Sequence, residues 1–234
     1  LFRAVDAVAF PRSGAVARMN FAFALARATW AARRLLEADH ATLVLGVGGY
    51  VMAPTVFAAW TLGIPAVLHE SNVAPGLANR ACARVAKLVL LTYPETAAKL
   101  GDVATEVIGC PVNPKVLTGN RTAAGARYGL DPDRPTVLVV GGSLGAATLN
   151  EIALVLAKGA TQLLHLTGPR YFDEISARYG ALPAHVVVRP YEDRMGDAFA
   201  IADLVVARAG SSTLAEICAV GKPSVLVPSP NVTD

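Results

Sequence analysis

The sequence has 234 residues, of which 53% are hydrophobic and 17% are charged, and its mean hydropathy is +0.44. This composition excludes a disordered chain, and the length predicts one large or two modest domains. Apolar residues occur in short runs and never eighteen in a row, so we expect no transmembrane helix. A net charge of +3 is too small to indicate a nucleic-acid partner, and we expect none.

The charge is distributed unevenly along the chain. Residues 1–90 carry a balance of +5, whereas residues 91–234 carry a balance of −2. A front part that is both basic and apolar is typical of a protein that contacts an anionic membrane surface. The cysteines Cys82, Cys110 and Cys218 follow neither disulfide nor zinc spacing, which favours a reducing compartment.

Short apolar runs alternate with helical patterns from residue 19 onward. The runs lack polar alternation, so we expect strands that are buried on both faces of parallel sheets, in an α/β fold with right-handed crossovers. The candidate strands are 41–46, 65–69, 87–92, 105–109, 136–140, 161–166, 185–189, 203–207 and 224–228. The candidate helices lie near 19–38, 53–62, 75–86, 94–100, 121–129, 145–157, 171–180, 193–202 and 212–220.

Turn-forming residues crowd the segment 109–120, and the alternation of strands and helices restarts after it. We therefore expect two domains, at 1–109 and 119–234, joined by a linker at 110–118. The chain starts at Leu1 rather than Met and stops just after an apolar strand, so we expect it to be the middle part of a longer protein.

The strongest local motif occupies residues 137–146, where a buried strand runs into a glycine-rich turn and then a helix. Glycines let the backbone approach a ligand, and the free N–H groups at a helix start favour an anion such as phosphate. We predict that Gly141, Gly142, Gly145 and the hydroxyl of Ser143 bind phosphate. The spacing differs from the dinucleotide fingerprint, which argues against NAD. A tight turn whose glycines serve packing alone is the alternative.

Residues 208–216 again read as strand, loop and helix, and they allow two interpretations. In the first, Thr213 is the N-cap of the helix and Glu216, three residues later, completes a capping box. In the second, the loop backbone meets a phosphate or a base, and the Glu216 carboxylate accepts hydrogen bonds from a sugar diol. The segment alone does not separate the two.

A third group follows two neighbouring strands, at 46–50 (GVGGY) and 69–72 (HESN). Open α/β sheets bind ligands at the carboxyl ends of their strands. The group from His69 to Asn72 is therefore a candidate for proton transfer or for hydrogen bonds to a polar substrate. In the alternative interpretation, Ser71 and Asn72 cap the helix that Pro75 opens.

Four segments occur in an order found in a known family: GVGGYVMAPTVFAAWTLGIPAVLHESN, GCPVN, GGSLGAATLN and ARAGSSTLAEICAVGKPSVLVP. In this the chain resembles the bacterial MurG family, which transfers N-acetylglucosamine (GlcNAc) to a lipid-linked muramyl-pentapeptide. The resemblance covers nearly the whole chain. It implies the GT-B architecture, in which two Rossmann-like domains with parallel sheets face each other across a cleft, both incomplete here.

The resemblance also implies roles for individual residues. Asn72 becomes an acceptor-side contact, Glu70 a candidate catalytic residue, and Ser143 a contact to the donor diphosphate. The implied donor loop consists of Ser211, Ser212, Thr213, Leu214, Ala215 and Glu216, with Glu216 on the uridine ribose.

The chain departs from the family pattern at two positions of the donor site. Glu192 stands at the uracil-contacting position, where an apolar residue is usual. We therefore expect only its backbone to contact uracil. Asn113 stands where the family commonly has an arginine, and asparagine supplies no cation. The family's glycine-rich loop with a proposed base would precede Leu1, and its glutamine-containing segment would follow Asp234. We therefore expect the chain alone to be inactive.

The predicted helix at 19–38 carries two apolar stripes. One stripe can pack on the protein, and the other would then face an anionic bilayer; burial by a preceding segment is the alternative. The stripes are Met19, Phe23, Ala26 and Trp30, and Phe21, Leu25, Ala28 and Leu35, with Arg18, Arg27, Arg33 and Arg34 beside them.

The resemblance implies transfer of GlcNAc from UDP-GlcNAc to undecaprenyl-pyrophosphoryl-MurNAc-pentapeptide, which converts lipid I to lipid II in peptidoglycan synthesis. It implies an inverting enzyme without metal or other cofactor, peripheral to the cytoplasmic side of the cell membrane. The alternatives are another GT-B enzyme that uses a UDP-sugar, such as a diacylglycerol glycosyltransferase or a UDP-GlcNAc 2-epimerase, and a non-catalytic binding piece of a split glycosyltransferase.

Overall fold

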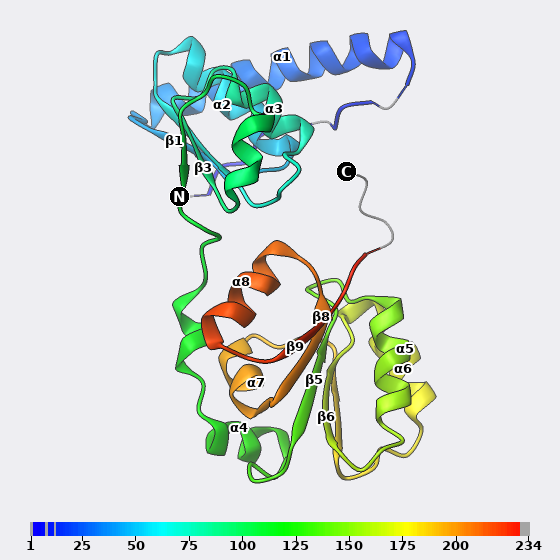
Figure 1. The fold of residues 1–234 in the computed structure, drawn as a ribbon. Coiled ribbons are helices and arrows are strands. Elements are labelled where there is room, and N and C mark those ends of the chain that lie inside the picture. Colours follow the sequence, from blue (N-terminus) through cyan, green and yellow to red (C-terminus); the bar gives the residue numbers. More distant parts are fainter. Residues whose placement is uncertain (1, 8, 12, 230–234) are drawn as a thin grey trace. The chain divides into compact units, whose positions relative to one another are not determined.

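The computed structural model describes residues 2–7, 9–11 and 13–229 (Figure 1). The chain divides into two compact units, Leu1–Cys110 (unit 1) and Pro111–Asp234 (unit 2). Each unit contains one sheet whose strands all run parallel. The predicted α/β fold with two parallel sheets is confirmed.

Unit 1 has a four-stranded sheet in the order β1-β2-β3-β4, so each strand pairs with the next one in the sequence. Its elements are α1 (Ala15–Ala38), β1 (Val44–Gly46), the 3₁₀ helix η1 (Tyr50–Met52), α2 (Ala53–Thr61), β2 (Ala66–Glu70), α3 (Leu77–Ala83), β3 (Leu88–Leu91), the 3₁₀ helix η2 (Pro94–Lys99) and β4 (Thr105–Val107).

The core of unit 1 lies between the sheet and helices α2 and α3. Leu68 and Leu91 are fully buried there together with Val56 of α2. The expectation that every strand is buried on both faces is wrong for the outer strands: Leu45 of β1 is 58% exposed, and all of β4 is exposed. Edge strands have a partner strand on one side only, so among the described residues they lack the cover that central strands receive.

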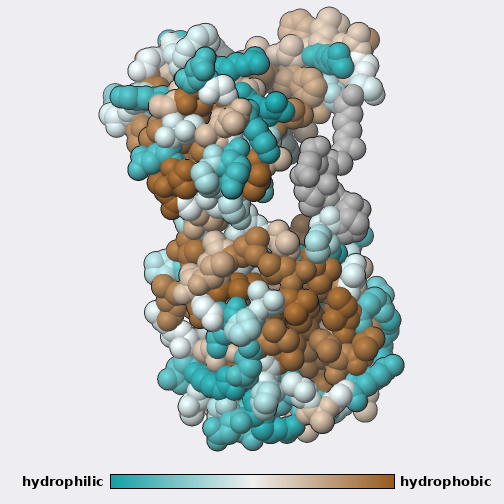
Figure 2. Space-filling view, in the orientation of Figure 1, coloured by the Kyte–Doolittle hydropathy of each residue, from teal (hydrophilic) through white to brown (hydrophobic). Residues whose placement is uncertain are grey.

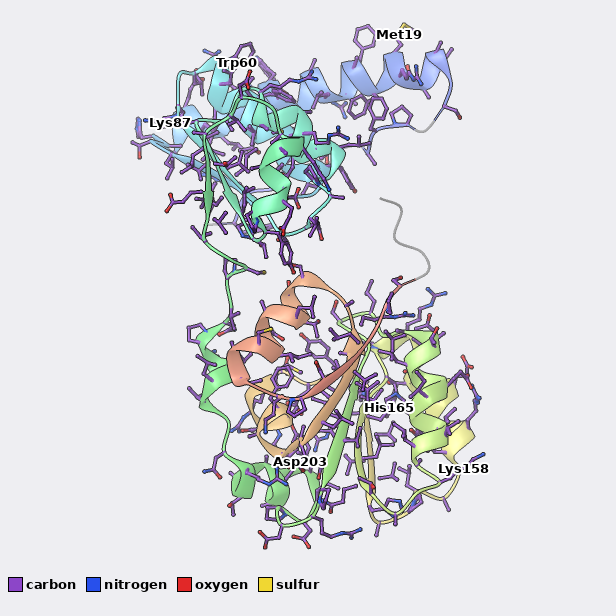
Figure 3. The ribbon with its side chains drawn as sticks, viewed as in Figure 1. Met19, Trp60, Lys87, Lys158, His165 and Asp203 are labelled. Carbon is purple, nitrogen blue, oxygen red and sulfur yellow. The ribbon has the colours of Figure 1, made fainter. Side chains whose placement is uncertain are left out.

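Helix α1 packs along α2 and turns its two apolar stripes in different directions. Ala28 is buried, and Phe21 and Leu25 are partly buried. Met19 and Phe23 belong to the other stripe and are exposed; Met19 projects outward in Figure 3. No helix in the described ranges is long and apolar enough to cross a membrane.

Unit 2 has a five-stranded sheet in the order β7-β6-β5-β8-β9. Its elements are the 3₁₀ helix η3 (Pro114–Thr118), α4 (Arg121–Tyr128), β5 (Thr136–Val140), α5 (Ala147–Leu156), β6 (Gln162–Leu166), the 3₁₀ helix η4 (Pro169–Tyr171), α6 (Phe172–Tyr179), β7 (Val186–Arg189), α7 (Met195–Ile201), β8 (Leu204–Arg208), α8 (Ser211–Val220) and β9 (Ser224–Val227).

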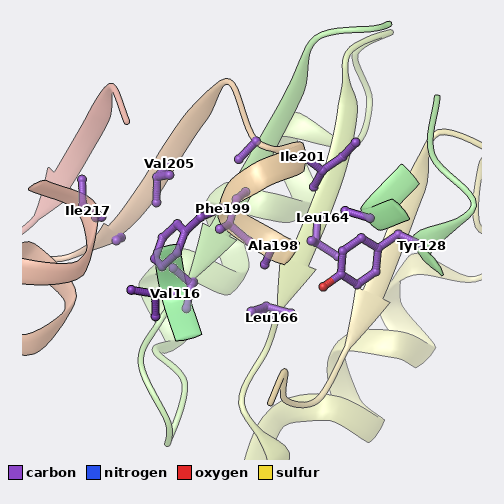
Figure 4. Packing of buried hydrophobic residues seen from close by; sticks show 14 of the residues in the cluster. Val116, Tyr128, Leu164, Leu166, Ala198, Phe199, Ile201, Val205 and Ile217 are labelled. Atoms are coloured by element: carbon purple, nitrogen blue, oxygen red, sulfur yellow. The ribbon is translucent and has the colours of Figure 1, made fainter. Parts of the chain in front are cut away.

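Both faces of this sheet are covered, α4, α7 and α8 lying on one side and α5 and α6 on the other (Figure 1). Successive residues of a strand point to opposite faces, so β5 serves two cores. Leu138 packs with Phe199 of α7 in the larger cluster, whose side chains interlock in Figure 4. Val139 packs with Leu149 of α5 on the other face.

The edge of this sheet at β9 is less well covered. Val225 is 51% exposed and Leu226 is 39% exposed. Figure 2 shows apolar side chains gathered on the face of unit 2 where β9 is visible in Figure 1.

The segment between the sheets is ordered by contact with unit 2. Val116 of η3 is buried in the larger core of that unit. The backbones of Gly119 and Gly196 lie so close that a Cβ atom on Gly119 would be 1.8 Å from the Gly196 carbonyl oxygen. The residues predicted as a linker at 110–118 thus include η3, which packs against α7.

Candidate functional site

The order of strands in unit 2 leaves a crevice outside the carboxyl ends of the paired strands β5 and β8. From β5 the chain moves outward through β6 and β7 and then returns to the other side of β5 with β8 and β9. Open α/β sheets bind ligands at the carboxyl ends of the strands where the direction of winding changes. The loops at that point are 141–146, after β5, and 209–210, after β8. These are the two segments that the sequence singled out for phosphate and nucleotide binding.

Helix α5 starts at this crevice without a side-chain cap. Its N-cap residue is Ala146, and the first intrahelical bond of the helix runs from the Asn150 N–H to the Ala146 carbonyl. The N–H groups of the first turn therefore keep their donors for a ligand, and the helix dipole favours an anion. Next to them is a pocket of about 310 Å³, lined by Gly141, Gly145, Ala146, Ala147, Thr148, Tyr171, Arg208 and Ser229.

Arg208 is the cation of this pocket, and the sequence analysis did not select it. Its guanidinium donates to the Pro228 carbonyl at 2.5 Å and lies 3.4 Å from the Thr148 hydroxyl in the first turn of α5. No acidic residue is among those that line the pocket. It is the first residue of the 208–216 motif and the last residue of β8, and this place at a carboxyl strand end is the signal that identifies it.

The phosphate-loop candidates take different places in this turn. Gly141 and Gly145 line the pocket, whereas Gly142 and Ser143 are exposed. The Gly145 N–H donates to the Gly142 carbonyl and closes the turn. Gly145 has φ 75°, and a Cβ there would be 2.1 Å from the Thr167 carbonyl oxygen, so glycine is required.

A buried polar network lies behind the phosphate loop. The Asn150 side chain of α5 donates to the Thr167 carbonyl, and its Oδ1 accepts from His165 Nε2 at 3.0 Å. His165 Nδ1 lies 2.9 Å from the Tyr179 hydroxyl, which donates to it when the imidazole is neutral. Burial lowers the pKa of His165 to about 4. The network joins α5, β6 and α6 and holds the loop that contacts Gly145.

Helix α8 starts at Ser211, so Thr213 lies inside the helix, and the capping box of the first interpretation does not form. The N-cap is Gly210, which makes no side-chain cap. Glu216 is half-buried one turn further on, and burial raises the pKa of its carboxyl above the ordinary value. The remaining donor-loop candidates are the exposed Ser212 and the partly buried Ser211, Thr213, Leu214 and Ala215.

Glu192 is turned into the interior of unit 2. Its carboxylate accepts from Arg127 at 2.7 Å, from the Tyr128 hydroxyl at 2.9 Å and from the Arg194 backbone N–H at 2.9 Å. Burial and the bond to Glu192 raise the pKa of Tyr128. The carboxylate is thus occupied by protein groups, so only the backbone of Glu192 could contact a nucleotide base such as uracil.

Asn113 is an exposed N-cap. Its Oδ1 accepts from the Lys115 N–H at 3.0 Å and starts η3, which leaves the side-chain amide nitrogen for another partner.

Unit 1 has a cavity of about 640 Å³ at the carboxyl ends of β1 and β2. One wall is apolar and comes from α1, α2 and the loop after β1; it includes Phe21, Leu25, Val47 and Phe57. The lining also contains polar residues, namely those from His69 to Asn72 and Asn79. The cavity therefore suits a ligand with an apolar and a polar part.

Glu70 is 2% exposed and accepts four hydrogen bonds. Its Oε1 accepts from the backbone N–H and the side-chain Nδ2 of Asn72, at 2.9 and 3.1 Å. Its Oε2 accepts from the Gly76 N–H at 3.1 Å and from Asn79 Nδ2 at 2.5 Å. Gly76 and Asn79 are partners that the sequence analysis missed, because it did not connect this loop with α3. Asn72 remains exposed at the cavity.

Comparison with known proteins connects these sites with one family. The glycosyltransferase family 28 N-terminal domain matches residues 1–91, and the C-terminal domain of the same family matches residues 136–234. Two curated relatives carry the name UDP-N-acetylglucosamine–N-acetylmuramyl-(pentapeptide) pyrophosphoryl-undecaprenol N-acetylglucosamine transferase. The protein of Clavibacter michiganensis is 46% identical over 94% of this chain and 60% of its own length. That of Frankia casuarinae is 45% identical over 84% of this chain and 54% of its own length.

A solved structure gives the same relationship. The crystal structure of Acinetobacter baumannii MurG matches with a TM-score of 0.65 and 31% identity, over 92% of this chain and 60% of that protein. The chain thus spans about 54 to 60% of the length of these relatives. The two family matches follow each other in order and together take in most of the chain. The chain belongs to glycosyltransferase family 28.

Proposed function

We propose that this protein transfers GlcNAc from UDP-GlcNAc to undecaprenyl-pyrophosphoryl-MurNAc-pentapeptide, the step from lipid I to lipid II in peptidoglycan synthesis. The observation that carries the proposal is the crevice at the carboxyl ends of β5 and β8, where two family motifs meet beside a pocket with a cation and an uncapped helix. The names of the relatives supply the donor and the acceptor.

In this proposal unit 2 binds the donor. The diphosphate lies against the Gly141–Gly145 loop and the first turn of α5, where Arg208 and the Ser143 hydroxyl add donors. These groups offset the negative charge that develops on the UDP leaving group, and the mechanism uses no metal. Glu216 accepts from the ribose hydroxyls, and the backbone of Glu192 contacts the base.

Unit 1 binds the acceptor in the proposal. The polar residues of its cavity receive the muramyl sugar, and Asn72 makes the contact. The reaction inverts the anomeric carbon, so a base removes the proton of the attacking hydroxyl.

The donor site is tested by titrating the chain with UDP and UDP-GlcNAc in a calorimeter. We expect Glu216→Ala and Ser143→Ala each to weaken UDP binding about tenfold, the effect of one hydrogen bond to a charged partner. Glu174→Ala is the matched control, because Glu174 is an exposed carboxylate of α6 outside the pocket. Unchanged affinity in both test variants would contradict the donor assignment.

The acceptor is tested by transfer. The Clavibacter michiganensis relative is prepared with its matched region replaced by this chain and is incubated with UDP-GlcNAc and a lipid I analogue. Transfer to that analogue, and not to diacylglycerol, is the expected result. Transfer to diacylglycerol alone would favour another UDP-sugar enzyme, epimerised donor would favour a 2-epimerase, and UDP binding without turnover would favour a binding piece.

We also propose that α1 holds the protein at the cytoplasmic face of the membrane. Its outer stripe includes Met19, Phe23 and Trp30, which are 55%, 70% and 60% exposed. The Arg34 guanidinium lies 4.8 Å from the Trp30 ring centre, so a cation accompanies the apolar surface. Such a helix inserts its apolar face among lipid headgroups, and its arginines attract anionic lipids.

Flotation with liposomes tests this proposal. The wild-type chain should float with vesicles that contain anionic lipid, and the double variant Phe23→Ser, Trp30→Ser should remain at the bottom. Val155→Ser removes an equally exposed apolar side chain from α5 of unit 2 and serves as control. Flotation that is independent of anionic lipid, or that survives the double variant, would contradict the proposal.

A further inference from the structure

The buried carboxylate of Glu70 connects two segments that border the unit 1 cavity. It lies at the end of β2, and its four donors come from the loop at Asn72 and Gly76 and from Asn79 in α3. An ionised carboxylate has about four acceptor positions, and all four are used here. Transfer of a proton to Glu70 would break one of these bonds. The arrangement is that of a support rather than of a base.

The same bonds determine how the amide groups are oriented. Asn79 Nδ2 faces two acceptors, Glu70 Oε2 and the His69 carbonyl, so its amide has one possible orientation. The Asn79 Oδ1 has no hydrogen-bond partner among the described residues and is buried. A buried oxygen without a partner costs about 1–3 kcal/mol. Turning the amide over would place Oδ1 against these two acceptor oxygens, so Asn79 keeps this orientation although its Oδ1 has no partner.

The Asn72 side-chain amide is also oriented by a hydrogen bond to Glu70. Its Nδ2 donates to Glu70 Oε1 at 3.1 Å, and its backbone N–H donates to the same oxygen. The Asn72 carbonyl is also held, by the Thr96 hydroxyl at 3.0 Å. The bond from one N–H of Nδ2 to Glu70 determines how the amide is turned, and Oδ1 is the hydrogen-bond acceptor that this exposed side chain offers to the cavity it lines, next to the second N–H of Nδ2.

We propose that Glu70 is a positioning residue that orients the Asn72 amide, so that Asn72 Oδ1 accepts a hydrogen bond from a hydroxyl or amide N–H of the acceptor sugar. The inference rests on the proposed acceptor site in unit 1. It goes further in naming the atom of the contact, the direction of the hydrogen bond and a role for Glu70 other than proton transfer.

The test is a calorimetric titration of the 234-residue chain with a soluble acceptor analogue, in which a short alkyl chain replaces undecaprenyl. Asn72→Ala should weaken binding about tenfold. Asn72→Asp keeps an oxygen acceptor but replaces the donor to Glu70 by a second carboxylate, so we expect a similar loss. Measurement in about 1 M salt, where the Debye length is about 3 Å, removes repulsion between the introduced carboxylate and the acceptor diphosphate as a cause.

Glu70→Gln supplies the second arm. It should weaken acceptor binding about tenfold alone and less than about twofold in the Asn72→Ala background, because it acts through Asn72. In nitrogen-edited NMR spectra it should also shift the Asn72 side-chain amide signals. If Glu70 acted only as the proton acceptor of the reaction, Glu70→Gln would leave the binding constant of the acceptor analogue unchanged. UDP affinity, which unit 2 provides, should stay the same in every variant.

The outcomes separate the two proposals. Wild-type chain that binds UDP but not the acceptor analogue contradicts the proposed acceptor site and, with it, this inference. Wild-type binding that Asn72→Asp preserves in high salt contradicts the orienting role of Glu70 alone. If Glu70→Gln does not fold, the comparison of Asn72→Asp with Asn72→Ala still decides the question, because Asn72 is exposed.

Discussion

His165 is fully buried and makes two hydrogen bonds, with Nδ1 to Tyr179 and Nε2 to Asn150. Protonation would give Nδ1 a proton that faces the Tyr179 hydroxyl and would place a charge in the core. The folded protein therefore prefers the neutral form, and the pKa falls from 6.5 to about 4.

The pH dependence of stability follows from this shift. Between pH 6.5 and 4 the unfolded chain binds more protons than the folded chain, so the free energy of unfolding decreases as the pH falls. We expect His165 to account for a loss of about 3 kcal/mol across that range. Urea unfolding at a series of pH values measures the loss, and an NMR titration locates the imidazole pKa.

His165→Gln is the control for this prediction. It removes the titrating group, so its stability should change less than that of the wild type between about pH 6.5 and 5, although the variant is less stable overall. An imidazole that titrates near its ordinary pKa of about 6.5, or parallel pH profiles of the two proteins, would show that burial does not hold His165 neutral.

The start of α5 depends on a close approach of two loops. Gly145, before the helix, and Gly168, after β6, both have positive φ, and a Cβ on Gly168 would be 2.4 Å from the Gly145 backbone. Gly142 also has positive φ, but a Cβ there would meet no atom within 4 Å. A substitution at Gly142 therefore introduces backbone strain alone, whereas one at Gly145 adds a steric clash.

We expect Gly142→Ala to cost about 1–2 kcal/mol, the strain of an L-residue at positive φ, and to reduce UDP affinity little. Gly145→Ala should cost clearly more and should abolish measurable UDP binding, because the loop must move away from Thr167. Thermal unfolding and UDP titration of both variants give the comparison. Equal effects of the two substitutions would mean that the contact with Thr167 is not tight.

The described residues form separate hydrophobic cores. One core consists of unit 1 residues such as Leu68 and Leu91, and two further cores consist of unit 2 residues such as Leu138 and Leu149. A protein with separate cores need not unfold in one step, so a single melting temperature does not describe it.

We expect two transitions in calorimetry and a shift of only one of them with UDP. Ligand at about a hundred times its dissociation constant stabilises the unit that binds it by about 2.7 kcal/mol. The shifted transition should be the one that Gly145→Ala lowers. A single transition that moves as a whole with UDP would show that the units unfold together.

The sequence by itself determined the elements and the class of the fold. All nine candidate strands form, because runs such as Thr136–Val140 are apolar at nearly every position and short. Among the candidate helices, 94–100 forms a 3₁₀ helix, η2, which starts with Pro94 and buries only Thr96. The glycine loop after β5 was also predictable, since its spacing is local.

Only the tertiary structure decided the roles of the charged side chains and the order of the strands. Glu192 meets Tyr128 across 64 positions of sequence, and β5 lies beside β8 although β6 and β7 come between them in the chain. Periodicity describes neighbours within an element, whereas these contacts arise when distant elements bury their apolar faces together. The carboxylates of Glu70 and Glu192 are buried among N–H and O–H donors, some of which come from other elements, and no local pattern in the sequence predicts those partners.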